Sequence, residues 1–468
     1  MPNPDINMVA PPEVYRERRA RLAESLTRPM IILAGRGRAR NYATNPYPFR
    51  AGSSYLYFGG PPVEGAAWII TPRSDGVEGC TLLRSPGEFE ETVWLGETPS
   101  DEALAEAAGV PIAALADPDD LIAILGGRPV SAICPPCPAS MEWMRSHQIP
   151  APNREELVAI VNLRLIKDEH EMIALRRAAR IAVEGHEAAI AATKPGRGEA
   201  HIAAAIMSVY TRYLSVPSFT PIVTVRGEAL HSETYPNKLK EGRLLLVDAG
   251  AEEPSGYASD ITRTWPVDGP FSPIQRHLYD TVLRAQREAI AACVPGKRFR
   301  DVHDLAGRLI CEGLVEAELL RGDPVELAAR YAHTLFFVHG LGHLVGLDVH
   351  DMEDFGDVAG YAPGRTRREE FGNKYLRLDR DLASGMVLTI EPGVYLVPAI
   401  WEHSELVAPF ADLVNRPKVD ALLADEFGGI RIEDTIQVLP EGEAGPEVLT
   451  GDLPTDADKL AEMVGAQQ

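Results

Sequence analysis

Apolar and polar residues alternate along the first 160 residues in blocks that predict short elements. Apolar runs typical of buried strands are separated by stretches of good helix formers. The predicted strands cover residues 30–35, 66–72, 80–86 and 130–135, and the predicted helices cover residues 13–26, 101–108 and 118–125. This alternation of strands and helices indicates a small α/β domain.

Beyond residue 165, a pattern of two consecutive helices is used twice. A helix that starts at Asp168 ends at Lys194-Pro195-Gly196, and a second helix follows over 198–216. Another helix over 274–293 ends at Val294-Pro295-Gly296, and a fourth follows over 300–320. Proline and glycine are ordinary helix stops, and the recurrence at a spacing of about 100 residues suggests one unit used twice. We therefore expect a domain with two related halves.

Residues 244–266 predict two strands joined by a tight connection, with an acid on each strand. Asp248 ends the apolar run that starts at Leu244, and Asp260 precedes the alternating residues 261–265. Two carboxylates about 4 Å apart repel each other by about 4 kcal/mol at an effective dielectric of about 20. A cation between them would relieve this repulsion. The alternative is that both are solvated turn acids.

Three later segments also place polar residues within apolar surroundings. His339, His343 and His350 lie in the glycine-rich stretch 336–351, where Gly340 and Gly342 disfavour a helix, so the HExxH arrangement is excluded. Residues 385–397 predict a strand that carries Glu391. Residues 428–439 predict a strand that carries Arg431 and Glu433. We expect Asp434 on the opposite face of that strand, as a solvated or structural acid.

Four carboxylates and one imidazole form the set expected for a pair of divalent ions. These residues are Asp248, Asp260, His343, Glu391 and Glu433. Oxygen ligands suit Mn²⁺, Mg²⁺ or Ca²⁺, and an imidazole shifts the preference towards Mn²⁺, Co²⁺, Fe²⁺ or Zn²⁺. A two-metal site can activate water and stabilise an oxyanion. Taken singly, a solvated strand acid at Glu391 and a structural histidine at His343 are the alternatives.

Composition narrows the possible partners. The net charge of −22 argues against nucleic acid and against an anionic membrane surface. There is no apolar run of about 20 residues and no secretory signal pattern at the start. Five cysteines do not make a disulfide framework, and Cys134 and Cys137 form a lone CxxC pair. A cytoplasmic protein is the simplest expectation.

Several segments resemble the metal-binding motifs of the pita-bread metallopeptidases, in the branch of the Xaa-Pro aminopeptidases and prolidases. They are VDAGAE, SDITRT, HGLGHLVGLDVHD, MVLTIEPGVY and GGIRIED, and YPFRAGSSYLYFGG resembles the amino-terminal domain of the aminopeptidase P group. The resemblance implies an α/β protein with an N-terminal α/β domain over residues 1–165. It implies a pita-bread domain over 166–450, with two pseudo-symmetric halves around a curved antiparallel sheet. We expect residues 451–468 to form a polar, loosely ordered tail.

The same resemblance implies roles for individual residues. The five candidate ligands would hold two metal ions, commonly manganese, with zinc or cobalt as alternatives. His231 and His350 would contact the substrate or the tetrahedral intermediate, and His339 would lie near the site. Glu391 would also shuttle protons to the leaving nitrogen, and Arg431 would brace the site. The resemblance also implies a homodimer or homotetramer that acts on Xaa-Pro peptides.

Two enzymatic activities remain open within this resemblance. The segment YLRLDRDL, with Arg377 and Arg380, resembles the prolidase version, in which an arginine could clamp the carboxylate of a dipeptide. The insertion 352–380 and the stretch 398–426 are longer than in a minimal aminopeptidase P. We expect an Xaa-Pro aminopeptidase, with an Xaa-Pro dipeptidase as the alternative. A non-catalytic pita-bread binding protein is a third, less favoured reading, because no ligand position is empty.

Overall fold

A computed structural model describes residues 8–42, 44–73, 79–85, 93–94, 96 and 99–464. The chain divides into two compact units, Met1–Arg164 and Leu165–Gln468. Among the described residues, none of the helices combines the length and the apolar character that a membrane span requires.

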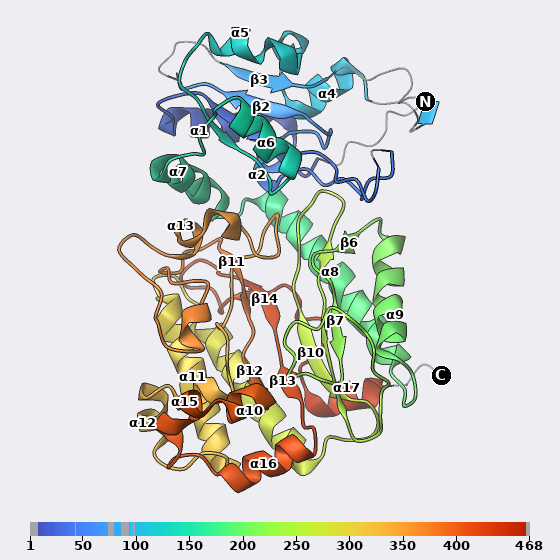
Figure 1. Ribbon diagram of the computed structural model, residues 1–468, viewed down its shortest axis with the longest axis vertical. Helices are drawn as coiled ribbons and strands as arrows, with labels where there is room; N and C mark the ends of the chain where they lie inside the picture. The colour runs from blue at the N-terminus through green and yellow to red at the C-terminus, as the bar shows by residue number, and fades with distance from the viewer. Residues whose placement is uncertain are drawn as a thin grey trace. The chain divides into compact units, whose positions relative to one another are not determined.

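The first unit is built on a mixed five-stranded sheet of order β4-β3-β2-β1-β5 (Figure 1). Its strands are β1 (Met30–Leu33), β2 (Ala67–Ile70), β3 (Cys80–Leu83), β4 (Leu115–Ala116) and β5 (Ser131–Ile133). β1 runs antiparallel to β2 and parallel to β5. The four predicted strands are confirmed with shorter bounds, and residue 86 of the third lies outside the described residues.

Helices cover both faces of this sheet. They are α1 (Pro12–Ser25), α2 (Ser53–Tyr57), α4 (Asp101–Ala108), α5 (Leu121–Leu125), α6 (Pro138–Ser146) and α7 (Arg154–Arg164). Ile31 and Leu33 pack in one apolar cluster with Leu121 and Leu125 of α5. On the other face, the guanidinium of Arg19 in α1 lies 4.3 Å from the ring centre of Trp68. The alternation of side chains along each strand therefore buries both faces.

The second unit contains two helix pairs, seen on either side of the strands in Figure 1. They are α8 (Glu169–Ala192) with α9 (Glu199–Arg212), and α10 (Pro273–Ala292) with α11 (Phe299–Glu316). A capping box starts the first helix of each pair: the N-cap Asp168 pairs with Glu171 of α8, and the N-cap Ser272 pairs with Gln275 of α10.

The turns between the paired helices show that the repeat is structural. The amide of Gly196 donates to the Leu239 carbonyl at 2.8 Å, and the amide of Gly296 donates to the Leu382 carbonyl at 2.8 Å. Both glycines have φ near +80°, at +83° and +82°, a conformation that favours glycine. The predicted two related halves are therefore confirmed, down to the hydrogen bonds of their turns.

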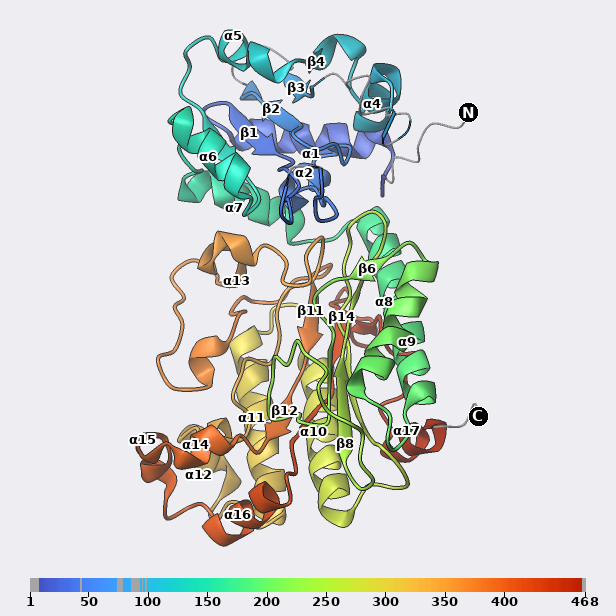
Figure 2. The ribbon, with the colours of Figure 1, turned by 45° about the vertical axis from the view of Figure 1, so that its right-hand side comes forward.

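The strands of the second unit gather between the helix pairs (Figure 2). One antiparallel sheet has the order β10 (Thr262–Pro266), β8 (Leu244–Asp248), β7 (Ile222–Thr224). A second sheet has the order β11 (Val387–Ile390), β14 (Asp434–Gln437), β15 (Glu447–Val448). Two further pairs are β12 (Gly393–Tyr395) with β13 (Gly429–Arg431), and β6 (Val216–Pro217) with β9 (Ala251–Glu252). A bridge between Thr262 and Glu433 joins the two halves.

Short helices complete this unit. They are α12 (Pro324–Ala329), α13 (Asp357–Gly360), α14 (Pro398–Glu402), α15 (Ser404–Val407) and α16 (Arg416–Ala424), with 3₁₀ turns at Ala332–Leu335, Glu353–Phe355, Asn373–Tyr375 and Ala408–Phe410. As expected, the glycine-rich stretch 336–351 forms no helix. The insertion 352–380 is largely irregular.

The structure corrects three predictions about these strands. The connection between β8 and β10 is not tight, because β9 and a turn lie within it, and Asp260 precedes β10 instead of lying on it. The strand predicted over 385–397 is broken at Glu391 and Pro392. The strand predicted over 428–439 is broken at Ile432 and Glu433.

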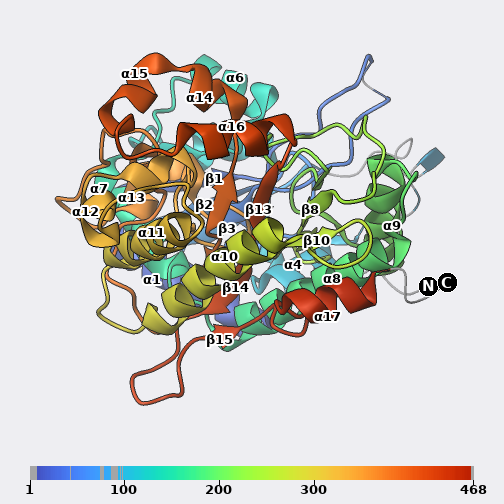
Figure 3. The same cartoon turned by 90° about the horizontal axis from the view of Figure 1, so that it is seen from below.

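The expectation of a loosely ordered tail is wrong for residues 451–464. Residues Ala457–Met463 form helix α17, which Asp456 caps at its N-terminus. Seen from below, α17 lies beside α8, and it also contacts α10 (Figure 3). Leu453 and Leu460 are fully buried, so burial of apolar side chains orders a segment with a polar sequence. Residues 465–468 lie outside the described residues.

Candidate metal centre

Three buried side chains from distant segments converge in the second unit. Asp260, His343 and Glu433 each offer one ligand atom, and these atoms lie within 4.8 Å of one another. Their residues are 5%, 3% and 1% exposed. The Nε2 atom of His343 is 3.4 Å from the Oδ2 atom of Asp260. Such a cluster has the dimensions and the donor chemistry of a site for a divalent cation.

The strand register brings Asp248 to the same place. Asp248 is paired with Thr262 between β8 and β10, and Asp260 lies two residues before Thr262. The two carboxylates lie close enough together for the charge of Asp248 to raise the pKa of Asp260. The Oδ1 atoms of both aspartates are buried and have no hydrogen-bond partner among the described residues. These oxygens are therefore open to a cation.

Backbone contacts fix the orientation of His343. Its amide donates to Thr389 Oγ1 at 3.1 Å, and its Nδ1 atom is 3.1 Å from the Leu344 carbonyl oxygen. A carbonyl can only accept, so Nδ1 carries a proton in this contact. The lone pair of neutral His343 then resides on Nε2, which faces the carboxylates. This arrangement is typical of a histidine that binds a metal.

Glu391 and Glu433 lie at the two strand breaks. Glu433 accepts a hydrogen bond from Thr262 Oγ1 at 2.6 Å, and its amide donates to the Thr262 carbonyl at 3.0 Å. The amide of Glu391 donates to the Leu341 carbonyl at 2.8 Å, and its Oε1 atom is 3.8 Å from His343 Nε2. The Glu391 side chain is 18% exposed, more than that of Asp260 or His343. Glu391 is thus the acid with the best access from solvent.

Crowding of the acids perturbs their protonation. Burial, and then the charge of Asp248, raises the pKa of Asp260 to about 7. Burial and neighbouring carboxylates also raise the pKa values of Glu391 and Glu433. Burial alone would lower the pKa of His343, but Asp260 and Glu391 outweigh it and raise the value to about 8. The site therefore binds protons unless cations compensate the negative charge, which fits the donor set of a metal centre.

Arg431 links the acids to two further side chains. It is 4% exposed, forms an ion pair with Asp248, and donates from Nη1 to the Tyr395 hydroxyl at 2.9 Å. The Tyr395 hydroxyl is 2.8 Å from His339 Nε2, and His339 Nδ1 is 2.8 Å from the Gly340 carbonyl. Burial and the charge of Arg431 lower the pKa of His339 to about 3, so His339 is neutral. Sequence reasoning missed Tyr395, although it ends the motif segment MVLTIEPGVY.

His350 and His231 lie beside this cluster. The ring centres of His350 and His343 are 4.2 Å apart at an angle of 73°, and His350 Nδ1 is 3.6 Å from Glu353 Oε2. Burial and the charge of His343 lower the pKa of His350 to about 2. His231 lies in the loop between β7 and β8, and burial and Arg431 lower its pKa. Both histidines are therefore neutral near pH 7.

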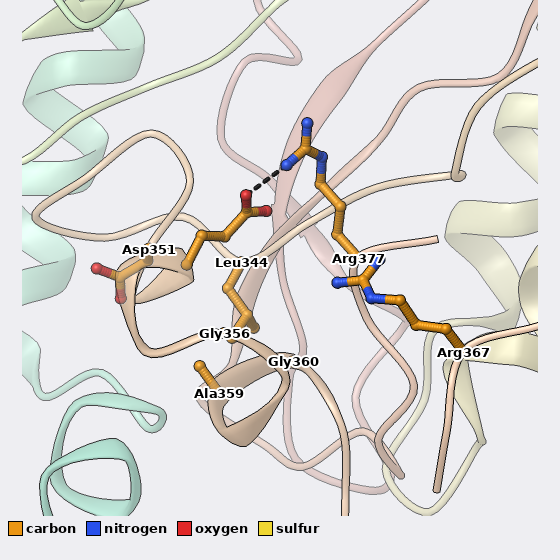
Figure 4. Close-up of a pocket in the computed structure, with 8 residues that line it drawn as sticks. Leu344, Asp351, Gly356, Ala359, Gly360, Arg367 and Arg377 are labelled. Carbon is orange, nitrogen blue, oxygen red and sulfur yellow. Dashed lines mark hydrogen bonds and ion pairs between the residues drawn. The ribbon is translucent and has the colours of Figure 1, made fainter. Parts of the chain in front are cut away.

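A pocket lies next to His350 and contains Arg377 (Figure 4). Arg377 forms an ion pair with Glu353, and the lining also includes Asp351 and Arg367. Glu353 was not predicted from the sequence. Arg380 donates instead to the backbone carbonyls of Val358 and Ala359, so its contacts are structural.

Comparison with known proteins gives consistent matches. Residues 173–440 match the sequence pattern of Metallopeptidase family M24, and residues 15–127 match Aminopeptidase P, N-terminal domain. Xaa-Pro aminopeptidase of Escherichia coli K12 is 30% identical over 97% of this chain and 98% of that protein. Xaa-Pro aminopeptidase 1 of Streptomyces coelicolor is 30% identical over 93% of this chain and 84% of that protein.

Solved structures give the same result. Zinc-substituted E. coli aminopeptidase P in complex with product aligns with a TM-score of 0.78 at 28% identity, over 99% of this chain and 100% of that chain. E. coli aminopeptidase P with the inhibitor Pro-Leu aligns with a TM-score of 0.77 at 29% identity, over 98% of this chain and 99% of that chain.

Proposed function

Because the chain belongs to metallopeptidase family M24, we propose that it is a metal-dependent Xaa-Pro aminopeptidase, which hydrolyses the bond between an N-terminal residue and a following proline. The expected fold class, an N-terminal α/β domain followed by a pita-bread domain, agrees with the full-length likeness to aminopeptidase P. The observation that carries the proposal is the buried cluster of Asp260, His343 and Glu433, with open aspartate oxygens beside it.

The proposed ligands of two divalent ions are the four acids and His343. The structure has the donor set for this purpose, since the orphaned oxygens of Asp248 and Asp260 need a cationic partner. When bound, such ions supply Lewis acidity and lower the pKa of water to near neutrality. We propose manganese, and elemental analysis of protein purified without chelator tests both the metal and its stoichiometry.

The neighbouring residues have distinct proposed roles. Glu391 is the most accessible acid and has a raised pKa, so it is suited to hold a proton and pass it to the leaving proline nitrogen. Neutral His231 and His350 are suited to contact the peptide and the developing oxyanion by hydrogen bonds. His339 contacts the Tyr395 hydroxyl, and Arg431 holds Asp248 in place through their ion pair.

One observation favours a second candidate function, an Xaa-Pro dipeptidase. Arg377 lies in the pocket next to His350, and its charge contributes to the lowered pKa of that histidine. Released from Glu353, the guanidinium could form a bidentate pair with the free carboxylate of a dipeptide. In an aminopeptidase, the Arg377–Glu353 ion pair would stay intact, since the substrate continues beyond proline.

Parallel hydrolysis of three substrates tests these functions. An Xaa-Pro dipeptide, an Xaa-Pro-Yaa tripeptide and a longer peptide are assayed with Mn²⁺, using the wild type and Arg377→Met. We expect turnover of the tripeptide and the longer peptide by both proteins. Turnover of the dipeptide alone, lost in Arg377→Met, would establish the dipeptidase. Turnover of none of the three would contradict both functions.

The remaining assignments are also proposals. We propose that residues 1–165 form the aminopeptidase-P-like domain and residues 166–450 the catalytic domain. We also propose a homodimer or homotetramer, which light scattering coupled to size exclusion would detect. The cytoplasmic location stays a prediction.

A further inference from the structure

A buried ion pair joins the start of the second unit to the residue after His350. Lys167 Nζ is 2.7 Å from Asp351 Oδ2, and the two side chains are 3% and 0% exposed. The residues are 184 positions apart in the sequence. Burial of two charges is costly unless their geometry is well matched, so such a pair specifies position more than it adds stability. The proposed chemistry uses neither residue.

Asp351 closes the loop that carries His350. Its amide donates to the Leu344 carbonyl at 2.9 Å, which joins the loop to the residue after His343. A Cβ atom on Gly346 would collide with the Asp351 carboxylate, so this carboxylate fills the interior of the loop. The loop ends are thereby fixed to each other, and Lys167 contacts the carboxylate that fixes them.

The loop is also docked on the segments that lead to the ligands. The amide of Val345 donates to the Val387 carbonyl at 3.0 Å, and the amide of Ala258 donates to the Gly346 carbonyl at 2.8 Å. Lys167 contributes a further link, because its own amide donates to the Gly385 carbonyl at 2.9 Å. Lys167 therefore contacts both the His350 loop and the start of the segment that ends at Glu391.

We infer that Lys167 is a positioning residue for the hydrolysis: through Asp351 it holds His350 in the orientation, with its ring 4.2 Å from that of His343, in which it meets the peptide. This inference rests on the proposed contact between His350 and the substrate. It differs from a purely structural role, in which loss of the ion pair would lower stability without a specific effect on turnover.

The test compares Lys167→Met, His350→Ala and the double variant. Misplacement of a contact by about 1 Å can cost up to about 100-fold in rate, so we expect Lys167→Met to lower kcat/KM for the tripeptide at least about tenfold. Bound metal should stay unchanged, since no proposed ligand is altered. The double variant should be no slower than His350→Ala, because Lys167 acts through His350.

A second variant keeps both charges. Gly346→Ala displaces the Asp351 carboxylate without removing the ion pair's charges, and it should reproduce the loss seen in Lys167→Met. This variant keeps the inference testable if Lys167→Met does not fold. Arg28→Met is the matched control, because it breaks a 2.8 Å ion pair to Glu156, which is 3% exposed, in the other unit. The control should lower Tm and leave the kinetics unchanged.

Several outcomes would overturn the inference. Wild-type kinetics in Lys167→Met or in Gly346→Ala would do so, as would losses that add to the loss in His350→Ala. Wild-type kinetics in His350→Ala would remove the role of that histidine and the inference with it. No peptide turnover by the wild type would instead contradict the proposed function.

Discussion

Replacing Asp260 by asparagine should stabilise the metal-free protein and weaken the stabilisation that metal provides. The folded protein raises the pKa of Asp260 from 3.8 to about 7. A raised carboxylate pKa means that the folded state binds more protons than the unfolded state between these two pH values. Stability of the metal-free protein therefore falls as pH rises from about 4 to about 7, and the full penalty is present at pH 8.

The size of this penalty follows from the shift. At about 1.4 kcal/mol per pKa unit, the ionised Asp260 destabilises the metal-free fold at pH 8 by on the order of 4 kcal/mol. The substitution removes this penalty and also takes a repelling charge away from the neighbouring acids. We therefore expect metal-free Asp260→Asn to melt about 4 °C or more above the metal-free wild type. Metal at 100 times its dissociation constant should stabilise the wild type by about 2.7 kcal/mol and the variant by much less. Peptide hydrolysis should be lost in the variant.

Thermal unfolding at pH 8, followed by circular dichroism after chelator dialysis and again with Mn²⁺, measures both effects. Asp434→Asn is the control, because Asp434 is also buried but forms an ion pair with Arg263 at 2.8 Å. That variant should lower Tm under both conditions. A metal-free Asp260→Asn protein that melts at or below the wild type would refute the argument from carboxylate repulsion. Full turnover by Asp260→Asn would refute its role as a ligand.

Three further predictions concern protons and hydrogen bonds. Metal binding should release protons and strengthen as pH rises from 6 to 8, because the pKa of Asp260 lies near 7; calorimetric heats that do not depend on the buffer would contradict this. Tyr395→Phe should lower kcat about tenfold with bound metal unchanged, because it removes the hydroxyl between Arg431 and His339; an unchanged kcat would rule out that link. His333→Phe should raise stability at pH 5 by about 2 kcal/mol. Burial lowers the pKa of His333 to about 3, so the wild type loses stability as pH falls below about 6.5, whereas phenylalanine takes up no proton. Neither ring nitrogen of His333 has a hydrogen-bond partner among the described residues, so the substitution breaks no hydrogen bond there. Equal denaturant midpoints at pH 5 would contradict it.

Local chemistry made the repeated helix pairs predictable. A proline and a glycine end each first helix, and the glycine adopts a positive φ that other residues resist. Because these signals lie within a few residues, the sequence alone shows where the helices stop. The convergence of the acids could also be predicted, since a carboxylate at the edge of an apolar run needs a partner wherever it lies.

Long-range pairing made one of the two strand breaks unpredictable. Pro392 is a local signal for the break at Glu391, but the apolar pattern continues through Glu433 and nothing local marks an interruption there. The break at Glu433 depends on its amide, which donates to Thr262, a residue 171 positions away. The Lys167–Asp351 ion pair was also unpredictable, because its residues are 184 positions apart and no local sequence pattern links them. Helix α17 was missed because its formation depends on burial of Leu460 and not on an amphipathic pattern of its own length.

The strand register explains how two glutamates from paired strands can face one site. β11 pairs Ile390 with Asp434, and β12 pairs Gly393 with Arg431, so the same register on both sides of the breaks sets Glu391 opposite Glu433. Residues opposite each other on paired strands share a face, and the alternation of side chains directs the next residue, Asp434, to Arg263.

The proposed ligands thus lie on or beside strands that pack in the core, whereas His231 and His350 lie in loops. Loops open at lower free energy than core strands. Substitutions in the His350 loop should therefore change turnover before they change metal content, and substitutions at the strand breaks should lower metal content and turnover together. Metal analysis alongside kinetics would distinguish the two classes, and a loop variant that loses metal first would contradict this division.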